Sequence, residues 1–357
     1  MTFIYFILIL GVVVFVHEFG HYLSAKKAGI YVYEFSIGMG PKIFKFNRKK
    51  KVKTKKGKIK YVPDETDYCI RLFPIGGFVQ MAGEEIEVDE NIPEEQRFQS
   101  KTWGQKMITV AAGVIMNFIL AIIVLFIIGL VNGVSLNSTV LDQVDTTKYP
   151  LLADGDRIIS VDGKKINNYD RLVLELQVHE EKAFVMEVKH KDGSTDEVKI
   201  QPVAVYDDDE KLLGYEYGFG ITGEQRHDLV GAIRFAFGKF WSTIEQMFFI
   251  ILYLITGKLS LGMLSGPVGI YNVVGTAAQT GVISLLSLLA LISINVGFIN
   301  FLPLPAFDGG RALFLIIEKI KGSPVNPKIE NTIHNISFIL LMILMVYITY
   351  NDILKFF

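Results

Sequence analysis

Two histidines and a glutamate are grouped in the segment His17-Glu18-Phe19-Gly20-His21. The segment fits H-E-x-x-H, in which two imidazoles one helical turn apart share a zinc ion and the glutamate acts as general base. It lies in an apolar run over residues 3–25, where unpaired polar groups are costly, so a bound metal is the favoured interpretation. The alternative is a pair of interfacial histidines that reach toward water at the helix end.

A third protein ligand is needed, because catalytic zinc sites use three side chains and keep the fourth position for water. Asp308 is the candidate, since it follows an apolar segment that is interrupted by Pro303 and Pro305 and precedes two glycines. Irregular backbone at membrane depth is tolerated where it lines a cavity or is buried in protein. The alternative role of Asp308 is to cap a helix over residues 309–321.

Two amides are further candidates, and the single cysteine limits the ligands that a metal can have. Asn295 and Asn300 lie on the same segment as Asp308 and either donate hydrogen bonds to a substrate carbonyl or oxyanion, or pair with neighbouring helices. Cys69 is the single cysteine, so neither an intramolecular disulfide nor a cysteine cluster can form. The predicted cofactor is therefore Zn²⁺ held by nitrogen and oxygen ligands.

The composition indicates a polytopic membrane protein. Half of the 357 residues are apolar, mean hydropathy is +0.37, and the apolar residues form long runs. A bilayer-crossing helix needs about 20 such residues, and four spans are predicted, at residues 3–25, 107–131, 282–307 and 333–350. Residues 229–257 carry three charges among aromatic side chains and are predicted to form one or two amphipathic helices on the membrane surface.

Basic residues set the predicted orientation. Residues 42–60 hold eleven Lys or Arg and no acid, which places this loop in the cytoplasm and the N-terminus outside. A second basic stretch, residues 311–328, agrees with four spans. The N-terminal apolar run lacks a basic start and a small-residue cleavage site, so a retained span is expected. A net charge of −1 argues against a nucleic-acid partner.

The remaining segment, residues 132–226, is predicted to be a small soluble domain of mixed α and β structure outside the cytoplasm. An Asp162-Gly163 hairpin turn and strands at residues 183–190 and 195–202 support this. It separates a first catalytic half, residues 1–131, from amphipathic helices at residues 227–281 and a second catalytic half at residues 282–357.

Several motifs together resemble the site-2 protease family, of the bacterial type represented by the regulator-of-sigma-E protease. They are HEFGH at 17–21, FSIGMG at 35–40, LFPIGGFV at 72–79, AAG to NF at 111–118, SGPVGI at 265–270 and the segment from Asn300 to Gly310. The resemblance implies an intramembrane zinc metalloprotease in which His17, His21 and Asp308 hold zinc, Glu18 is catalytic, and Asn295 and Asn300 help seat the substrate. It departs from the family pattern where Phe307 replaces the usual Leu, and it has room for one PDZ-like domain where some relatives carry two.

The resemblance also implies a substrate and a fold. The substrates would be single-pass membrane proteins already cut by another protease, such as anti-sigma factors or remnant signal peptides. Residues 67–81 would form a membrane-associated β-hairpin whose edge strand, with Ile70, Arg71 and Leu72, pairs with unwound substrate; alternatively the hairpin only packs against the spans. Residues 132–226 would be an extracytoplasmic PDZ-like domain that excludes bulky substrates or binds a new C-terminus. The whole protein would lie in the inner membrane of a bacterial cell.

Two other functions would use part of these features. A catalytically inactive, membrane-tethered PDZ adaptor would keep the outer domain but would have no need of Glu18. An ion transporter would also place histidine and aspartate within a membrane, but the sequence has no internal repeat or paired broken helices of the kind that transporters carry. A zinc metalloprotease is the prediction that uses all of the motif residues.

Overall fold

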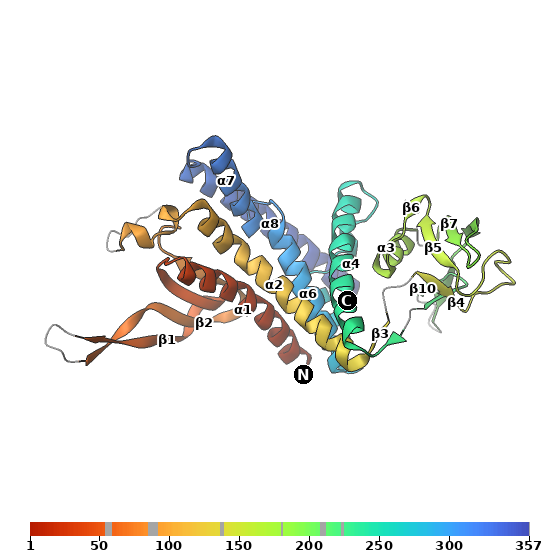
Figure 1. Ribbon diagram of the computed structural model, residues 1–357, viewed down its shortest axis with the longest axis horizontal. Helices are drawn as coiled ribbons and strands as arrows, with labels where there is room; N and C mark the ends of the chain where they lie inside the picture. The colour runs from red at the N-terminus through yellow and green to blue at the C-terminus, as the bar shows by residue number, and fades with distance from the viewer. Residues whose placement is uncertain are drawn as a thin grey trace. The chain divides into compact units, whose positions relative to one another are not determined.

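A computed structural model describes residues 1–53, 59–84, 92–135, 139–179, 181–207, 212–222 and 225–356. The chain forms two compact units, one made of Met1–Ala121 with Leu264–Phe357 and the other of Ile122–Met263. The predicted metal ligands all lie in the first unit, which is built from long helices and one long hairpin (Figure 1).

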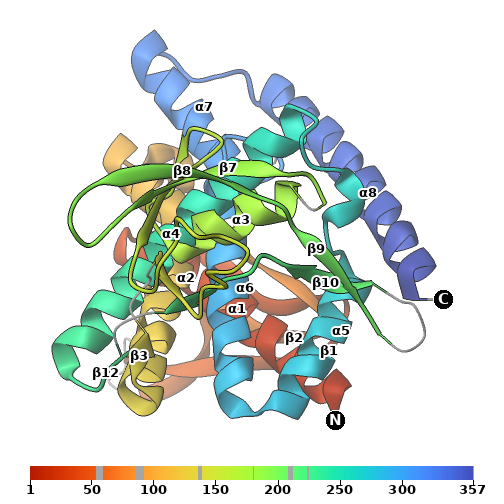
Figure 2. The same ribbon diagram turned by 90° about the vertical axis from the view of Figure 1, so that its right-hand side faces the viewer.

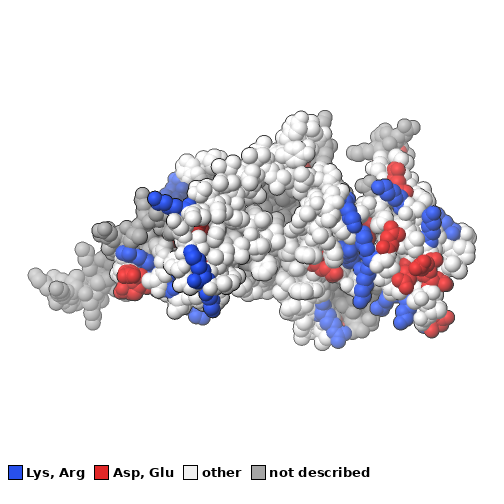
Figure 3. Space-filling model, turned by 90° about the horizontal axis from the view of Figure 1, so that it is seen from above, with Lys and Arg blue, Asp and Glu red and all other residues white. Residues whose placement is uncertain are grey.

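Among the described residues, four helices are long and apolar enough to cross a membrane, which agrees with the four spans predicted. They are α1 (Thr2–Lys27), α2 (Trp103–Asn132), α6 (Val282–Phe301) and α8 (Pro327–Phe356). The most apolar 18-residue stretch of α8 contains no buried residue, so its apolar side chains are available to lipid. Figure 3 shows a broad area without charged side chains over the helical part of one face.

The third span ends earlier than predicted. It was expected to continue to residue 307, but α6 ends at Phe301 and the backbone turns extended at Leu302, because Pro303 and Pro305 lack the N–H groups that a helix needs. A new helix, α7 (Asp308–Lys321), begins after the break. A Cβ on Gly309 would lie 2.2 Å from the Leu302 carbonyl oxygen, so glycine is required where α7 folds back on the break.

A side chain near the end of α8 caps the N-terminus of another helix, α5 (Pro267–Thr280). Asp352, which lies near the end of α8 and is 1% exposed, accepts hydrogen bonds from the backbone N–H groups of Gly266 and Gly269, both at 2.8 Å. An aspartate oxygen at a helix N-terminus satisfies donors that the helix itself leaves unpaired. The cap here comes from a distant helix instead of from the preceding residue.

Strands β1 (Val32–Lys53) and β2 (Ile59–Met81) form the hairpin beside α1. The segment predicted as a basic loop, residues 42–60, forms strand in its described part, while residues 54–58 lie outside the described residues. The hairpin folds back on itself, because residues 34–37 pair both with 77–80 and with 67–70. Residues 67–70 pair in turn with 44–47.

This register corrects the predicted edge strand. Tyr68, Cys69 and Ile70 have paired neighbours on both sides, so they lie inside the sheet and cannot add a substrate strand. The segment from Gly77 to Met81 pairs on one side alone among the described residues, which makes it the free edge. The prediction failed because it treated residues 67–81 as a separate hairpin, whereas the partners of residues 67–70 come from β1.

The second unit contains a six-stranded sheet with one helix against it (Figure 2). Its strands follow the order β11-β4-β5-β7-β8, with β6 beside β5. Strands β7 (Phe184–Lys189) and β8 (Thr195–Ile200) confirm the two predicted strands. The other strands of the sheet are β4 (Val140–Asp142), β5 (Arg157–Val161), β6 (Lys164–Lys165) and β11 (Gly220–Thr222), and the helix is α3 (Tyr169–His179). Two further sheets have two strands each. One pairs β9 (Val203–Tyr206) with β10 (Leu212–Glu216), and the other pairs β3 (Val134–Ser135) with β12 (Gln225–Arg226).

One histidine of this unit is paired with two carboxylates. His190, at the end of β7, lies 2.9 Å from the Asp156 carboxylate and 3.1 Å from the Asp196 carboxylate. The hydrogen bond to Asp196 raises the pKa of His190 above its usual value. These contacts join the start of β5, the end of β7 and β8.

A single helix, α4 (Leu229–Ile255), forms where amphipathic helices were predicted. Its Lys239 donates to Asp170 of α3, and its Glu245 accepts from Asn168. Two of the charges that indicated a membrane-surface helix are thus used for packing against α3. The carboxylate of Glu175 on α3 is fully buried and meets Arg171, Lys164 and the Tyr253 hydroxyl of α4.

Candidate metal centre

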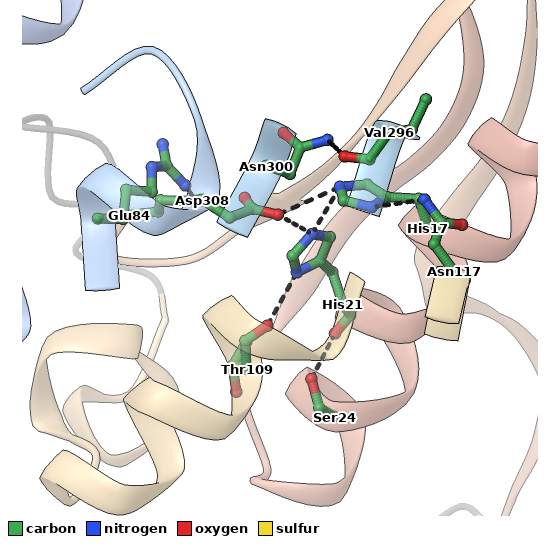
Figure 4. Close-up of polar contacts among 10 residues, drawn as sticks. His17, His21, Ser24, Glu84, Thr109, Asn117, Val296, Asn300 and Asp308 are labelled. Carbon is green, nitrogen blue, oxygen red and sulfur yellow. Dashed lines mark hydrogen bonds and ion pairs between the residues drawn. The ribbon is translucent and has the colours of Figure 1, made fainter. Parts of the chain in front are cut away.

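His17, His21 and Asp308 converge in the first unit, as predicted (Figure 4). The Asp308 Oδ2 atom lies 3.2 Å from His17 Nε2 and 3.1 Å from His21 Nε2, and the two Nε2 atoms are 3.3 Å apart. Helix α1 supplies both imidazoles from one face, and the break after α6 brings the start of α7 to them. The side chains are 10–19% exposed.

These separations fit a zinc ion. Zinc–nitrogen distances of about 2.0–2.1 Å in a tetrahedral site put ligand atoms about 3.3 Å apart, and the three observed separations are 3.1–3.3 Å. Two imidazoles and one carboxylate are also the donor set of a catalytic zinc with one open position. Residues from distant parts of the chain therefore already hold the spacing that a metal needs.

Asp308 does not cap α7. The N-cap is Phe307, which makes no side-chain cap, and the Asp308 carboxylate faces the histidines. Burial opposes ionisation of this carboxyl, but the interactions with His21 and His17 outweigh burial and lower its pKa. The carboxylate is the form of this side chain that can ligate a metal ion.

One face of α2 receives the two imidazoles. His21 Nδ1 donates to the Thr109 carbonyl at 2.8 Å, and the Asn117 amide lies 3.3 Å from His17 Nδ1. Gly113 lies between these two residues, and a Cβ there would come within 2.3 Å of His21 Nε2. The absence of a side chain at Gly113 therefore creates the space that the imidazoles occupy.

Glu18 shares a cavity of about 470 Å³ with the three ligands. The edge strand forms another wall, from Gly77 to Met81. A Cβ on Gly77 would lie 2.9 Å from Glu18 Cγ and 2.8 Å from the Ser36 carbonyl, so glycine allows the strand to approach the general-base candidate. The ion pair between Arg311 of α7 and Glu84 also lines the cavity.

The predicted substrate-seating amides lie on α6 but do not line this cavity among the described residues. Asn300 donates its amide hydrogen to the carbonyl of Val296, at 2.9 Å, in its own helix (Figure 4). Asn295 is half-buried. The contact of Asn300 leaves a role toward substrate open to it, because a side-chain rotation can redirect its amide.

The three predicted hairpin residues also lie off the cavity wall. Ile70 and Leu72 are exposed, and Arg71 donates to Glu34 at 2.6 Å and to Ser36 at 2.8 Å. Arg71 thus holds two stretches of β1 and β2 together. It stabilises the hairpin that presents the edge strand.

Sequence reasoning missed the contribution of α2. Thr109, Gly113 and Asn117 recur every fourth residue, which puts a small polar residue, a glycine and an amide on one helix face. That spacing of non-aliphatic residues within an apolar span was a usable signal. It required knowledge that this face meets α1.

Comparison with known proteins agrees with this centre. The family model "Peptidase family M50" matches residues 5–344. The "Regulator of sigma-W protease RasP" of Bacillus subtilis is 33% identical, over all of this chain and 99% of the relative. The "Zinc metalloprotease RasP" of Shouchella clausii is 31% identical over the same shares, and a putative zinc metalloprotease of Fusobacterium nucleatum is 34% identical over the full length of both chains. The chain therefore belongs to peptidase family M50, and it is a membrane zinc metalloprotease of the site-2 type.

Proposed function

We propose that this enzyme hydrolyses a peptide bond within the transmembrane segment of single-pass membrane proteins, as a step of regulated intramembrane proteolysis. The observation that carries the proposal is the position of Glu18 and two zinc ligands on α1, a candidate membrane span. A hydrolytic centre on such a helix is suited to bonds that soluble proteases do not reach.

Each residue of the centre has a distinct task. When bound, zinc polarises the substrate carbonyl and lowers the pKa of water. His17, His21 and Asp308 hold the metal. The Glu18 carboxylate accepts the proton of the attacking water and returns it to the leaving amine. We assign Asn295 and Asn300 to the substrate carbonyl, which they reach after Asn300 releases the Val296 carbonyl.

Substrate must unwind before cleavage, since the hydrogen bonds of a helix cover its carbonyls. The edge from Gly77 to Met81 offers replacement backbone hydrogen bonds beside Glu18, as an exposed strand does in β-augmentation. The exposed side chains of Ile70 and Leu72 extend the apolar surface of the same hairpin, where they contact substrate side chains.

The likeness to a regulator of sigma-W protease favours anti-sigma factors as substrates, with remnant signal peptides as a second group. These substrates would be cut first by another protease. Residues 132–226 would act as a PDZ-like domain outside the cytoplasm that excludes intact outer domains or binds the new C-terminus. The basic stretch at residues 42–60 supports a bacterial inner-membrane enzyme with its N-terminus outside.

Reconstitution in proteoliposomes with a model transmembrane peptide tests the proposal. Glu18→Gln is expected to abolish cleavage while keeping zinc, because it changes the base and leaves the ligands intact. Asp308→Ala is expected to lose both zinc and cleavage, and a chelator should do the same until zinc is restored. Full biological activity of Glu18→Gln in cells would instead favour a catalytically inactive PDZ adaptor, which has no need of this centre.

A further inference from the structure

One buried amide beside the metal centre has an unexplained oxygen. Asn117 on α2 is fully buried, and its side-chain nitrogen lies 3.3 Å from His17 Nδ1. Its side-chain oxygen has no hydrogen-bond partner in the described part of the chain. Buried amide oxygens nearly always have a partner, so this one calls for a reason.

The ring nitrogen of His17 that faces the candidate metal position determines which nitrogen carries the proton of the neutral imidazole. His17 Nε2 is the atom that faces Asp308 and His21 Nε2. A neutral imidazole that gives Nε2 to a metal carries its proton on Nδ1, which then acts as a donor. The amide nitrogen of Asn117 is also a donor and cannot accept that proton.

A half-turn of the Asn117 amide about its Cβ–Cγ bond gives the side-chain oxygen a donor, the Nδ1–H of His17, and moves the amide nitrogen to the position that the oxygen held. The turn exchanges an oxygen and a nitrogen of similar size, so the side chain keeps its packing. The oxygen then faces the Nδ1–H of His17. The backbone carbonyl of Asn117 is occupied separately, by the Ser293 hydroxyl at 2.8 Å.

We propose that Asn117 is a positioning residue that accepts a hydrogen bond from His17 Nδ1–H and thereby fixes the tautomer and ring plane of this zinc ligand. His21 has the equivalent support, since its Nδ1–H donates to the Thr109 carbonyl at 2.8 Å. Both supports come from one face of α2, two turns apart, with Gly113 between them. Helix α2 thus orients both imidazoles of α1 for metal binding.

Zinc affinity of the full-length protein in detergent is the direct test, measured by competition with a chromogenic chelator. Asn117→Leu keeps the approximate size but removes the acceptor, and it is expected to weaken zinc binding about 10–100-fold, as loss of such a support does in other zinc sites. Asn117→Asp supplies a stronger acceptor, so its zinc Kd is expected to equal or fall below the wild-type value.

A matched control separates positioning from packing. Ser293→Ala removes a buried hydrogen bond to the same residue but leaves the amide in place, and it should leave the zinc Kd unchanged. Thermal unfolding of the zinc-free proteins shows whether each variant is folded. A purely structural role for Asn117 would make the Asp and Leu variants equally poor.

Equal zinc affinity of Asn117→Leu and wild type would overturn the inference. If Asn117→Leu does not fold, the aspartate variant decides alone, and zinc binding more than about tenfold weaker than wild type would refute it. The inference rests on the metal centre and not on the proposed substrate. Failure of the wild-type protein to bind zinc would refute the centre itself, whereas zinc-loaded protein that cleaves no peptide would refute the proposed substrate alone.

Discussion

Gly113→Ala is expected to damage the metal centre without weakening the helix that carries it. The added Cβ would lie 2.3 Å from His21 Nε2 and 2.7 Å from His17 Cε1, whereas carbon contacts need about 3.5 Å. One or both imidazoles must therefore shift by about 1 Å, a misplacement that can cost about 100-fold in rate. Metal–ligand distances tolerate only about 0.2 Å, so zinc content should fall as well.

The assay compares zinc content by atomic emission, peptide cleavage in proteoliposomes and thermal unfolding. Alanine favours a helix over glycine by about 1 kcal/mol, so the variant should unfold no earlier than wild type when both are zinc-free. Gly104→Ala is the matched control, because it lies on the same helix and its Cβ meets nothing within 4 Å. A Gly113→Ala protein with one zinc and wild-type cleavage would refute the geometry described here.

Three further outcomes are expected. Gly77→Ala should retain zinc but cleave the model peptide more slowly, because its Cβ would push the edge strand away from Glu18; wild-type cleavage would contradict this. Glu175→Leu should destabilise the second unit by about 3–5 kcal/mol in denaturant unfolding, since it leaves the buried Arg171 without its carboxylate partner; an unchanged unfolding midpoint would argue against the pair. His190→Asn should lower the melting temperature at pH 5.5 and have less effect as the pH rises. The pKa of His190 is raised in the folded protein, so protonated His190 stabilises the fold below the unfolded pKa of 6.5, and this stabilisation is lost as the pH rises through the folded pKa. A decrease in melting temperature that does not change with pH would exclude this linkage.

Local sequence patterns predicted the spans and the side chains that converge at the candidate metal centre. Hydrophobic length located α1, α2, α6 and α8, because a bilayer imposes a length that the sequence must meet. The H-E-x-x-H motif at His17 and the proline-interrupted apolar segment before Asp308 predicted their convergence. The end of α6 was wrong because the apolar run continues through two prolines that the helix itself cannot include.

Long-range pairing was the part that local patterns did not contain. The strand around Ile70 was assigned to an edge, but its second neighbour comes from residues 34–37 of the same hairpin. The support of His17 by Asn117 was missed for the same reason, since it depends on which face of α2 meets α1. Both depend on contacts between residues more than 30 positions apart in the chain.

The aspartate cap of α5 has a consequence for synthesis of the protein. The backbone N–H groups of Gly266 and Gly269 are synthesised 86 and 83 residues before Asp352, whose carboxylate accepts their hydrogen bonds. Until Asp352 leaves the ribosome, its carboxylate cannot cap the first turn of α5. A nascent chain that ends before Asp352 therefore keeps these two backbone N–H groups without the Asp352 acceptor. Chains truncated ahead of Asp352 should therefore be preferred targets of membrane quality-control proteases, although every residue of the metal centre is already present.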